Sequence, residues 1–210
     1  MQINRFLGIV LKCCIFIISY APFVYGQKMT LEEVVNVMEN TNKCGTVFRV
    51  PTNNVKLEYF NGLLKSGDLT ENKETSIKSS IADTEAENAD YLNIVRQGFD
   101  QYYKFSTVYY VPDTIYKRML NAKEFIYYDY ELHKVMSAPG VCKPTLAILP
   151  GTDKDELALH YLDGRKVDRP LPYQKKTFMS AYKKLFKRKT YLQDQIKWFN
   201  EQFHLIYAFD

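Results

Sequence analysis

Three short apolar runs that each stop at a proline constrain the fold of this chain most. The runs "GTVFRV", "STVYYV" and "PTLAIL" are rich in β-branched, aromatic or aliphatic residues and are followed by Pro51, Pro112 and Pro150. Proline has no backbone N–H to offer a strand ladder, so each run is predicted to be a strand that ends there. A long helical stretch separates the first two runs, which predicts a crossover between parallel strands.

Capping patterns and apolar spacing predict the helices of the first half. Thr30 with Glu33, and Thr84 with Glu87, have the spacing of a capping box, so we expect a helix to begin at each pair. Between them, "NNVKLEYFNGLLKSG" has helical periodicity and a glycine stop. Residues 66–83 are polar and poor in bulky side chains, and we expect a mobile loop or a frayed helix there.

The second half completes an α/β pattern. Asp113 can cap a helix over "TIYKRMLNAK", "FIYYD" is predicted to be a further strand, and the dipeptide Asp163-Gly164 predicts a hairpin turn. Beyond Pro172 we expect a helical tail over residues 173–207. The predicted fold is a three-layer α/β sandwich around a mixed, partly parallel sheet, with C-terminal helices and one domain over residues 27–210.

The first 26 residues have the pattern of an export signal. A start with one positive charge precedes an apolar stretch from Phe6 to Val24, and small Gly26 suits the last position before cleavage. A transmembrane anchor is the alternative, but Lys12 and Pro22 interrupt the apolar run. We therefore expect a periplasmic or secreted protein, cleaved near Gly26, with no transmembrane segment in the mature chain.

After cleavage 184 residues remain, with 26 basic and 24 acidic side chains. Aromatic residues make up 15% of the whole sequence, which disfavours disorder.

Export decides how the cysteines are interpreted. Cys44 and Cys142 are the two cysteines left, and both would meet an oxidising compartment. A long-range disulfide and two buried free thiols both remain open, because spacing alone does not place the two Cα atoms.

The tail has an apolar seam with one defect. Phe178, Leu185, Leu192 and Phe199 recur every seven residues, as in a helix that packs along one face. Lys189 does not fit this seam. Thr190 and Gln193 have capping-box spacing, which favours two helices broken near Thr190 over one continuous rod.

A basic region overlaps this seam. Residues 169–193 hold eight basic side chains and no acid, an asymmetry that can steer an anionic surface or partner toward one side of the molecule. The candidate binding residues are Lys183, Lys184, Lys187, Arg188, Tyr191 and Trp198. The last two aromatics could form an exposed stacking strip or could widen a buried face. For the patch as a whole, the alternative to binding is an ordinary solvated helix face. No base-reading motif accompanies the charges, so we expect no nucleic-acid partner.

Signatures of known chemistry are sparse. The three histidines lie in different segments without metal-binding spacing, and the usual nucleophile, phosphate-binding and dinucleotide motifs are missing from the sequence. We expect no metal and no cofactor. Two constellations remain open, namely Cys142 activated by His133 or His160, and an acidic cluster that could hold a cation or act as acid and base. The acidic cluster is Asp153, Asp155 and Glu156.

Two resemblances add expectations. The segment "VCKPTLAIL" with "LALHYLDGRKV" and a terminal helix resembles the second half of a thioredoxin-like fold, although "VYYVPDTIYKRM" stands where that family has its reactive cysteine pair. The segments "TVFRVPTNNVKLEYF" and "NADYLNIVRQGFDQYYKFSTVYYV" resemble uncharacterised exported proteins of the Bacteroidota. This second resemblance implies export but no activity.

The sequence thus favours a non-catalytic exported protein. We expect it to bind an unknown protein partner or an anionic surface in the periplasm or cell envelope. The alternative is a thioredoxin-like redox or thiol-dependent enzyme that uses Cys142.

Overall fold

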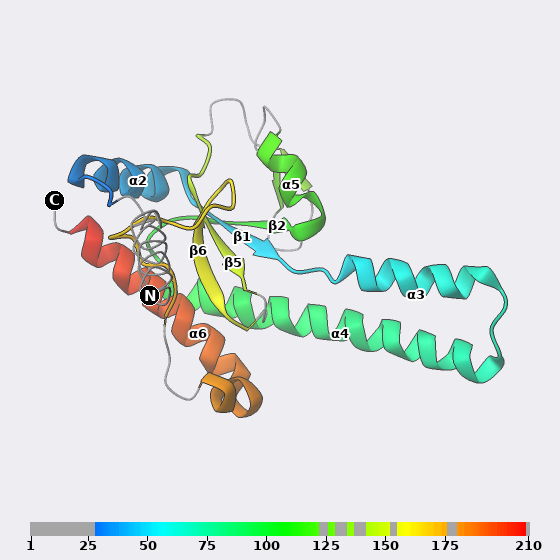
Figure 1. Ribbon diagram of the computed structural model, residues 1–210. Helices are drawn as coiled ribbons and strands as arrows, with labels where there is room; N and C mark the ends of the chain where they lie inside the picture. Colours follow the sequence, from blue (N-terminus) through cyan, green and yellow to red (C-terminus); the bar gives the residue numbers. More distant parts are fainter. Residues whose placement is uncertain are drawn as a thin grey trace, which may run out of the picture.

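A computed structural model describes residues 28–121, 126–128, 134–136, 142–151, 155–175 and 180–208 of the 210-residue chain (Figure 1). The predicted leader, His133 and Asp153 lie outside the described residues. Within them, no helix is long and apolar enough to cross a membrane.

A mixed sheet forms the centre of the fold, in the strand order β4-β3-β2-β1-β5-β6. The central strand β1 pairs in parallel with both β2 and β5, while β3, β4 and β6 join the two sides antiparallel. The strands are β1 (Thr46–Val50), β2 (Val108–Pro112), β3 (Ile126–Tyr128), β4 (Lys134–Met136), β5 (Leu146–Pro150) and β6 (Leu157–Tyr161). The predicted mixed, partly parallel sheet is confirmed.

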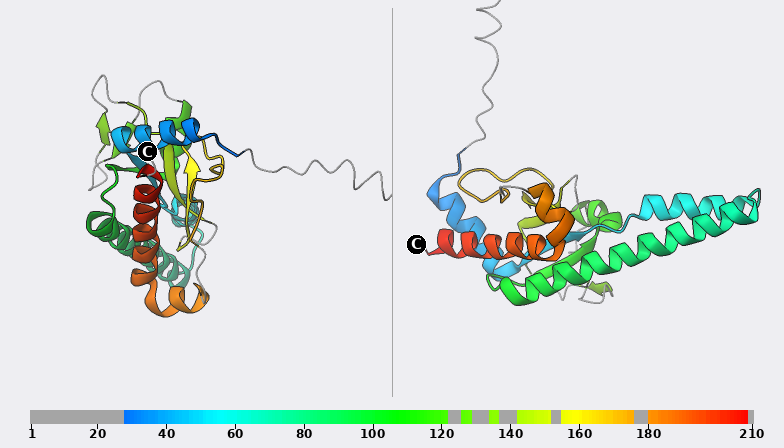
Figure 2. Two further views of the ribbon diagram at one scale, coloured as in Figure 1. Left: turned by 90° about the vertical axis from the view of Figure 1, so that its left-hand side faces the viewer. Right: turned by 90° about the horizontal axis from the view of Figure 1, so that it is seen from below.

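Helices cover both faces of this sheet, which gives the predicted three layers (Figures 1 and 2). The long helices α4 and α6 pack against each other on one face, and α5 lies on the other. The described helices are α2 (Leu31–Cys44), α3 (Asn54–Ser66), α4 (Glu71–Tyr102), α5 (Asp113–Asn121) and α6 (Ser180–Tyr207). The capping box of Thr30 and Glu33 starts α2 as predicted.

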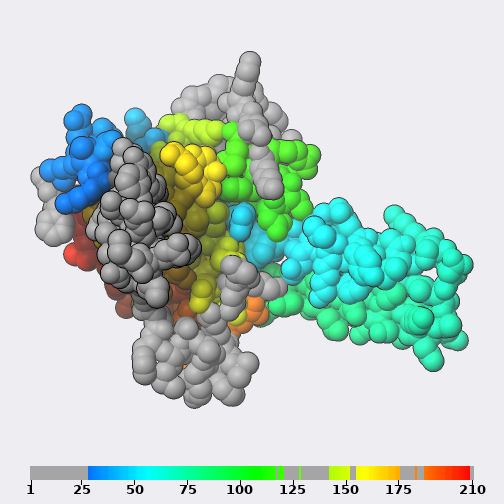
Figure 3. All heavy atoms as spheres, viewed as in Figure 1, coloured from blue at the N-terminus to red at the C-terminus, as the bar shows by residue number. Residues whose placement is uncertain are grey.

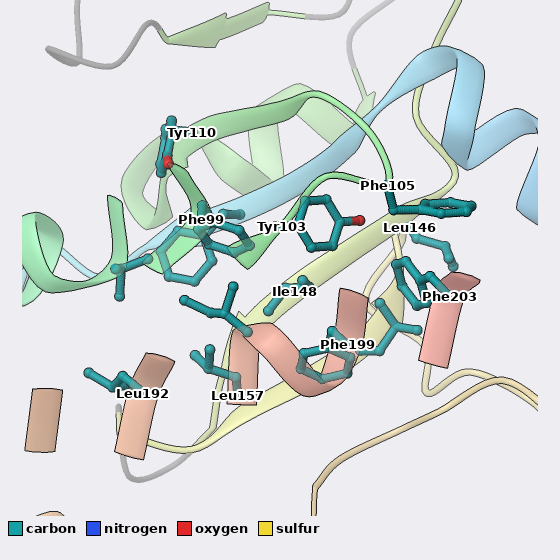
Figure 4. Close-up of a cluster of buried hydrophobic side chains, with 14 of the residues drawn as sticks. Phe99, Tyr103, Phe105, Tyr110, Leu146, Ile148, Leu157, Leu192, Phe199 and Phe203 are labelled. Carbon is teal, nitrogen blue, oxygen red and sulfur yellow. The ribbon is translucent and has the colours of Figure 1, made fainter. Parts of the chain in front are cut away.

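Successive side chains of β1 point to opposite faces of the sheet, so this strand contributes to two separate core clusters. Phe48 and Val50 belong to the larger cluster under α4 and α6, whereas Val47 belongs to the smaller cluster under α5. Figure 4 shows the larger cluster, in which the ring of Phe99 meets that of Phe48 edge-to-face, with 5.4 Å between ring centroids. On the α6 side the buried residues are Leu192, Ile196, Phe199 and Phe203, which confirms the described part of the predicted seam.

The helix α4 is longer than the sequence predicted. Residues 71–83 are helical rather than a loop, and Thr84 lies inside the helix instead of capping it. The Thr84 hydroxyl donates a hydrogen bond to the Ser80 carbonyl oxygen one turn back, at 2.7 Å. Of the two alternatives predicted for residues 66–83, a loop or a frayed helix, the structure has a helix from Glu71 onward, and the predicted helix start at Thr84 is wrong.

Together α3 and the first half of α4 form a hairpin that projects from the sheet domain (Figure 3). We call α3 with residues 71–88 of α4 the arm. Side-chain amides join its two helices at the base: Asn53 donates to Asn88 (2.6 Å), which donates to the carbonyl oxygen of Thr52 (2.7 Å). Thr52 in turn donates to the carboxylate of Asp113 at the start of α5. The arm is thus anchored to the sheet domain by polar contacts.

The tail differs from the prediction in two respects. Gln174, predicted to be helical, instead forms an isolated β-bridge with Ala158. Of the helix predicted over 173–207, the described part begins at Ser180. The predicted break is present, but the non-helical residue is Lys187 rather than Thr190. Past this kink, the buried amide of Gln195 accepts from the Leu157 backbone N–H and donates to the Asp155 carbonyl oxygen, both at 2.8 Å.

The predicted turn at Asp163-Gly164 is also present. Gly164 has a positive φ of 88°, and the Arg165 backbone N–H donates to the Asp163 carboxylate at 3.0 Å. An isolated bridge joins His160 to Lys166 across the turn, while the main ladder of β6 runs to β5.

Candidate partner-binding surfaces

The basic tail offers fewer free charges than the sequence suggested. Lys187 and Lys189 are exposed and Lys183 is half-buried, while the side chain of Lys184 lies outside the described part. Arg188 instead pairs with Asp155 at 2.7 Å, with the two side chains only 25% and 15% exposed. Its guanidinium also lies 5.5 Å from the centroid of the Tyr91 ring. The Arg188 side chain therefore belongs to the packing of α6 against its neighbours.

Of the two alternatives for the aromatics, an exposed strip or a wider buried face, the structure has the second. Tyr191 is only 3% exposed, and Trp198 packs partly buried against the core, with its ring 5.1 Å from that of Phe199. These two aromatics widen the buried face of α6. The patch that remains consists of the lysines around the kink.

The cysteines do not provide a nucleophile in this state. Cys44 at the end of α2 and Cys142 form a disulfide, with their Cα atoms 5.3 Å apart. This is one of the two alternatives that the sequence left open. The His160 ring is engaged in other contacts. Its Nδ1 lies 3.0 Å from the Gly164 carbonyl oxygen, and the ring packs edge-to-face against that of Tyr173.

The two described residues of the acidic cluster are also engaged in structural contacts. Asp155 pairs with Arg188, and Glu156 accepts a hydrogen bond from Gln174 at 3.1 Å. Among the described residues, no group of three or more histidine, cysteine or carboxylate side chains could hold a metal ion.

A cleft of about 550 Å³ is lined by the end of α4, the segment that follows it, strand β2 and Tyr128 of β3. Its polar groups mostly satisfy one another. The Tyr103 hydroxyl lies 2.8 Å from that of Thr46 and 3.2 Å from that of Ser106, and burial raises the pKa of Tyr103 to about 12. Burial likewise raises the pKa of Tyr110 at the floor of the cleft. Burial therefore keeps both phenols neutral at ordinary pH.

The arm exposes large apolar side chains. On α3, Val55 is 82% exposed and Tyr59 is 63% exposed, and none of the residues of this helix is buried. The four-residue spacing places both side chains on one stripe of the helix. Leu57, Phe60 and Leu64, which are half-buried, lie on the side turned toward α4. The Val55 and Tyr59 stripe, which we call the arm face, therefore points away from the rest of the hairpin.

A second apolar surface lies between α2 and the end of α6. It is a groove of about 500 Å³ with Met and aliphatic side chains on its walls and Lys28 at its margin. Leu31, Leu205 and Tyr207 in this region are 72%, 54% and 39% exposed. The residues that form this α2/α6 groove are Lys28, Met29, Leu31, Val34, Val35, Met38, Pro170, Ile206 and Tyr207.

Sequence reasoning missed both surfaces. Within the part of the chain that the structure describes, all the exposed large hydrophobic side chains belong to these two regions. The spacing of Val55 and Tyr59 was a usable signal, but it predicted only that α3 is a helix, because a single sequence does not say which stripe meets the core. The groove joins segments from opposite ends of the chain and left no local pattern.

No family model, curated protein or solved structure matches the chain. The resemblances to thioredoxin-like folds and to exported proteins of the Bacteroidota therefore stay predictions.

Proposed function

We propose that this chain is an exported, non-catalytic α/β protein that binds a protein partner through its arm. The observation that carries the proposal is the arm face: Val55 and Tyr59 stand exposed on a projecting helix that has no buried residue. Exposed apolar side chains grouped on one stripe are a feature of protein interaction sites. A helix that presents apolar anchors four residues apart is suited to a groove on a partner.

Burial of the arm face would also favour binding energetically. Full burial of a Val or aromatic side chain stabilises by roughly 1.5–3 kcal/mol each, and α3 leaves its two most exposed apolar residues in water. A partner that covers the arm face recovers this free energy. The helix α3 is also held to the domain mainly at its base, through Asn53 and Asn88, so a partner would stabilise its outer turns.

Export is part of the proposal and has independent support. The first 26 residues have the composition of a cleavable leader, and a disulfide such as Cys44–Cys142 persists mainly in oxidising compartments.

A photo-activatable cross-linking residue placed at position 59 tests the proposal in cells that make the protein. We expect a discrete cross-linked band from position 59, and none when the same residue replaces Lys73, an exposed polar position on the other helix of the arm. Equal labelling from positions 59 and 73, or none from either, would overturn the proposal.

An anionic surface is the second candidate, supported by the exposure of Lys187 and Lys189 beside the kink. Retention of the protein on anionic vesicles at low salt tests it. We expect Lys183→Gln, Lys187→Gln and Lys189→Gln together to lower retention, with Arg188 left intact because it pairs with Asp155. If neither added salt nor the three substitutions lowered the retention, the result would count against this candidate.

A thiol enzyme that uses Cys142 is the remaining alternative, and it requires reduction of the Cys44–Cys142 bond first. Thiol titration of the native, unreduced protein separates the cases. A reactive thiol at Cys142 would favour the enzyme, and the lack of one would favour the binding protein.

A further inference from the structure

We infer that the partner of the arm is a second copy of this chain, whose α2/α6 groove receives the arm face. The inference rests on the proposed function, since it names the protein that the arm binds. It follows from a match between the two exposed apolar surfaces that the described residues form. One is convex and carries Val55 and Tyr59, and the other is concave, with walls from α2 and α6.

The two surfaces lie at opposite ends of the molecule. Figures 1 and 2 show α2 and the C-terminal end of α6 on one side of the sheet and the arm projecting from the other. One molecule cannot place its own arm in its own groove. Each copy therefore offers one arm and one groove, and the contact must join two copies.

The shapes fit the helix-in-groove mode of recognition, in which side chains spaced by three or four residues anchor an amphipathic helix. The groove volume of about 500 Å³ lies within the range of roughly 300–1,000 Å³ that holds a bound group. Met29 and Met38 are among its walls, and the flexible thioether side chain adapts to an incoming apolar group. Tyr59 is the natural central anchor, because tyrosine is enriched among residues that dominate interface energies.

Charge favours the same pairing. The helix α2 carries more acids than bases, and α3 carries more bases than acids, so the two helices attract when they come together. In α2 the charged residues are Glu32, Glu33, Glu39 and Lys43, and in α3 they are Lys56, Glu58 and Lys65. Lys28 at the margin of the groove can also face Glu58, which neighbours Tyr59.

A contact between two different surfaces is head-to-tail, so it closes into a ring or extends as a filament. One helix in one groove is a small interface, below the usual size of a permanent complex. We therefore expect association in the range of roughly 10 μM to 1 mM, with the average mass rising steadily with concentration.

Complementation between two variants tests the inference. The arm variant carries Val55→Ser and Tyr59→Ser, and the groove variant carries Leu31→Ser and Tyr207→Ser. All four side chains are exposed, the least of them Tyr207 at 39%, so both variants should fold. Sedimentation should find each variant monomeric alone. Their equimolar mixture should form one-to-one dimers and nothing larger, because only one intact arm and one intact groove remain between them. A Lys73→Ser variant is the matched control and should associate like the wild type.

The result separates the inference from the proposed function. A wild type that stays monomeric up to about 1 mM, or a mixture of variants that stays monomeric while the wild type associates, would overturn the self-association. If position 59 still cross-links a different protein, the arm binds a partner but not its own kind. A monomeric protein without any cross-link from position 59 would overturn both.

Discussion

The Cys44–Cys142 disulfide yields a quantitative prediction of stability. The bonded cysteines are 98 residues apart in the sequence and join the end of α2 to the segment that leads into β5. A cross-link lowers the conformational entropy of the unfolded chain, and for a loop of this length the chain-entropy relation gives about 4.7 kcal/mol at room temperature.

The perturbation is the double substitution Cys44→Ala with Cys142→Ala. We expect the free energy of unfolding to fall by roughly 2–5 kcal/mol, because the entropic figure is reduced wherever the unfolded chain keeps residual structure. Cys44 is buried, and alanine removes its sulfur without adding a polar group. Urea unfolding followed by circular dichroism in non-reducing buffer measures the difference.

Reducing buffer provides the control. It should lower the stability of the wild type to about that of the double variant and leave the variant unchanged. If the wild type and the variant were equally stable without reductant, the bond would not constrain the unfolded chain and the reasoning would be refuted.

Two further predictions concern the core. Burial raises the pKa of Tyr103 and of Tyr116 to about 12, above the value of about 10 in an unfolded chain. The unfolded state therefore loses these protons first, and the free energy of unfolding should fall between about pH 10 and pH 12, by on the order of 2 kcal/mol per tyrosine; urea titrations across this range check it, and Tyr103→Phe should flatten the decline. A Cβ at Gly98 would lie 2.7 Å from Ile196 Cδ1, so Gly98→Val should destabilise by about 1–3 kcal/mol in thermal unfolding, and adding Ile196→Ala should cost less than the two separate changes suggest.

The sheet was predictable because its signals are local. Each strand that ends at a proline is a short run of residues that fit a pleated, buried surface, and Pro51, Pro112 and Pro150 mark the ends in any context. The tail seam was predictable for a similar reason, since Leu192, Ile196 and Phe199 keep one face toward the core over successive turns.

The first half of α4 was not predictable by the same rules, although periodicity did predict α3, the other helix of the arm. Residues 71–83 lie on a projecting hairpin with little core to meet, so their sequence has little apolar periodicity. The capping pattern at Thr84 misled because a threonine hydroxyl can bond equally well to a carbonyl oxygen one turn back, as it does to Ser80.

Two of the candidate binding residues, Arg188 and Tyr191, pack within the fold for a reason that the sequence does not show. Whether Arg188 is free depends on Asp155, which is 33 residues away and reaches it only through the packing of α6. Tyr191 lies off the seven-residue seam and is still buried, because α6 meets neighbours on more than one side. Such contacts between distant segments leave no spacing in the sequence.

The attachment of the arm has a mechanical consequence. Figure 1 shows β1 pointing toward the arm, and α3 begins at Asn54, shortly after β1 ends at Val50. Ladders on both edges hold β1 in place. The part of a tension on the tip that passes through α3 would run lengthwise along β1 and load both ladders at once in shear, instead of peeling bonds apart in succession. The molecule is therefore suited to transmit a pulling force from its extremity to a strand that is paired on both edges.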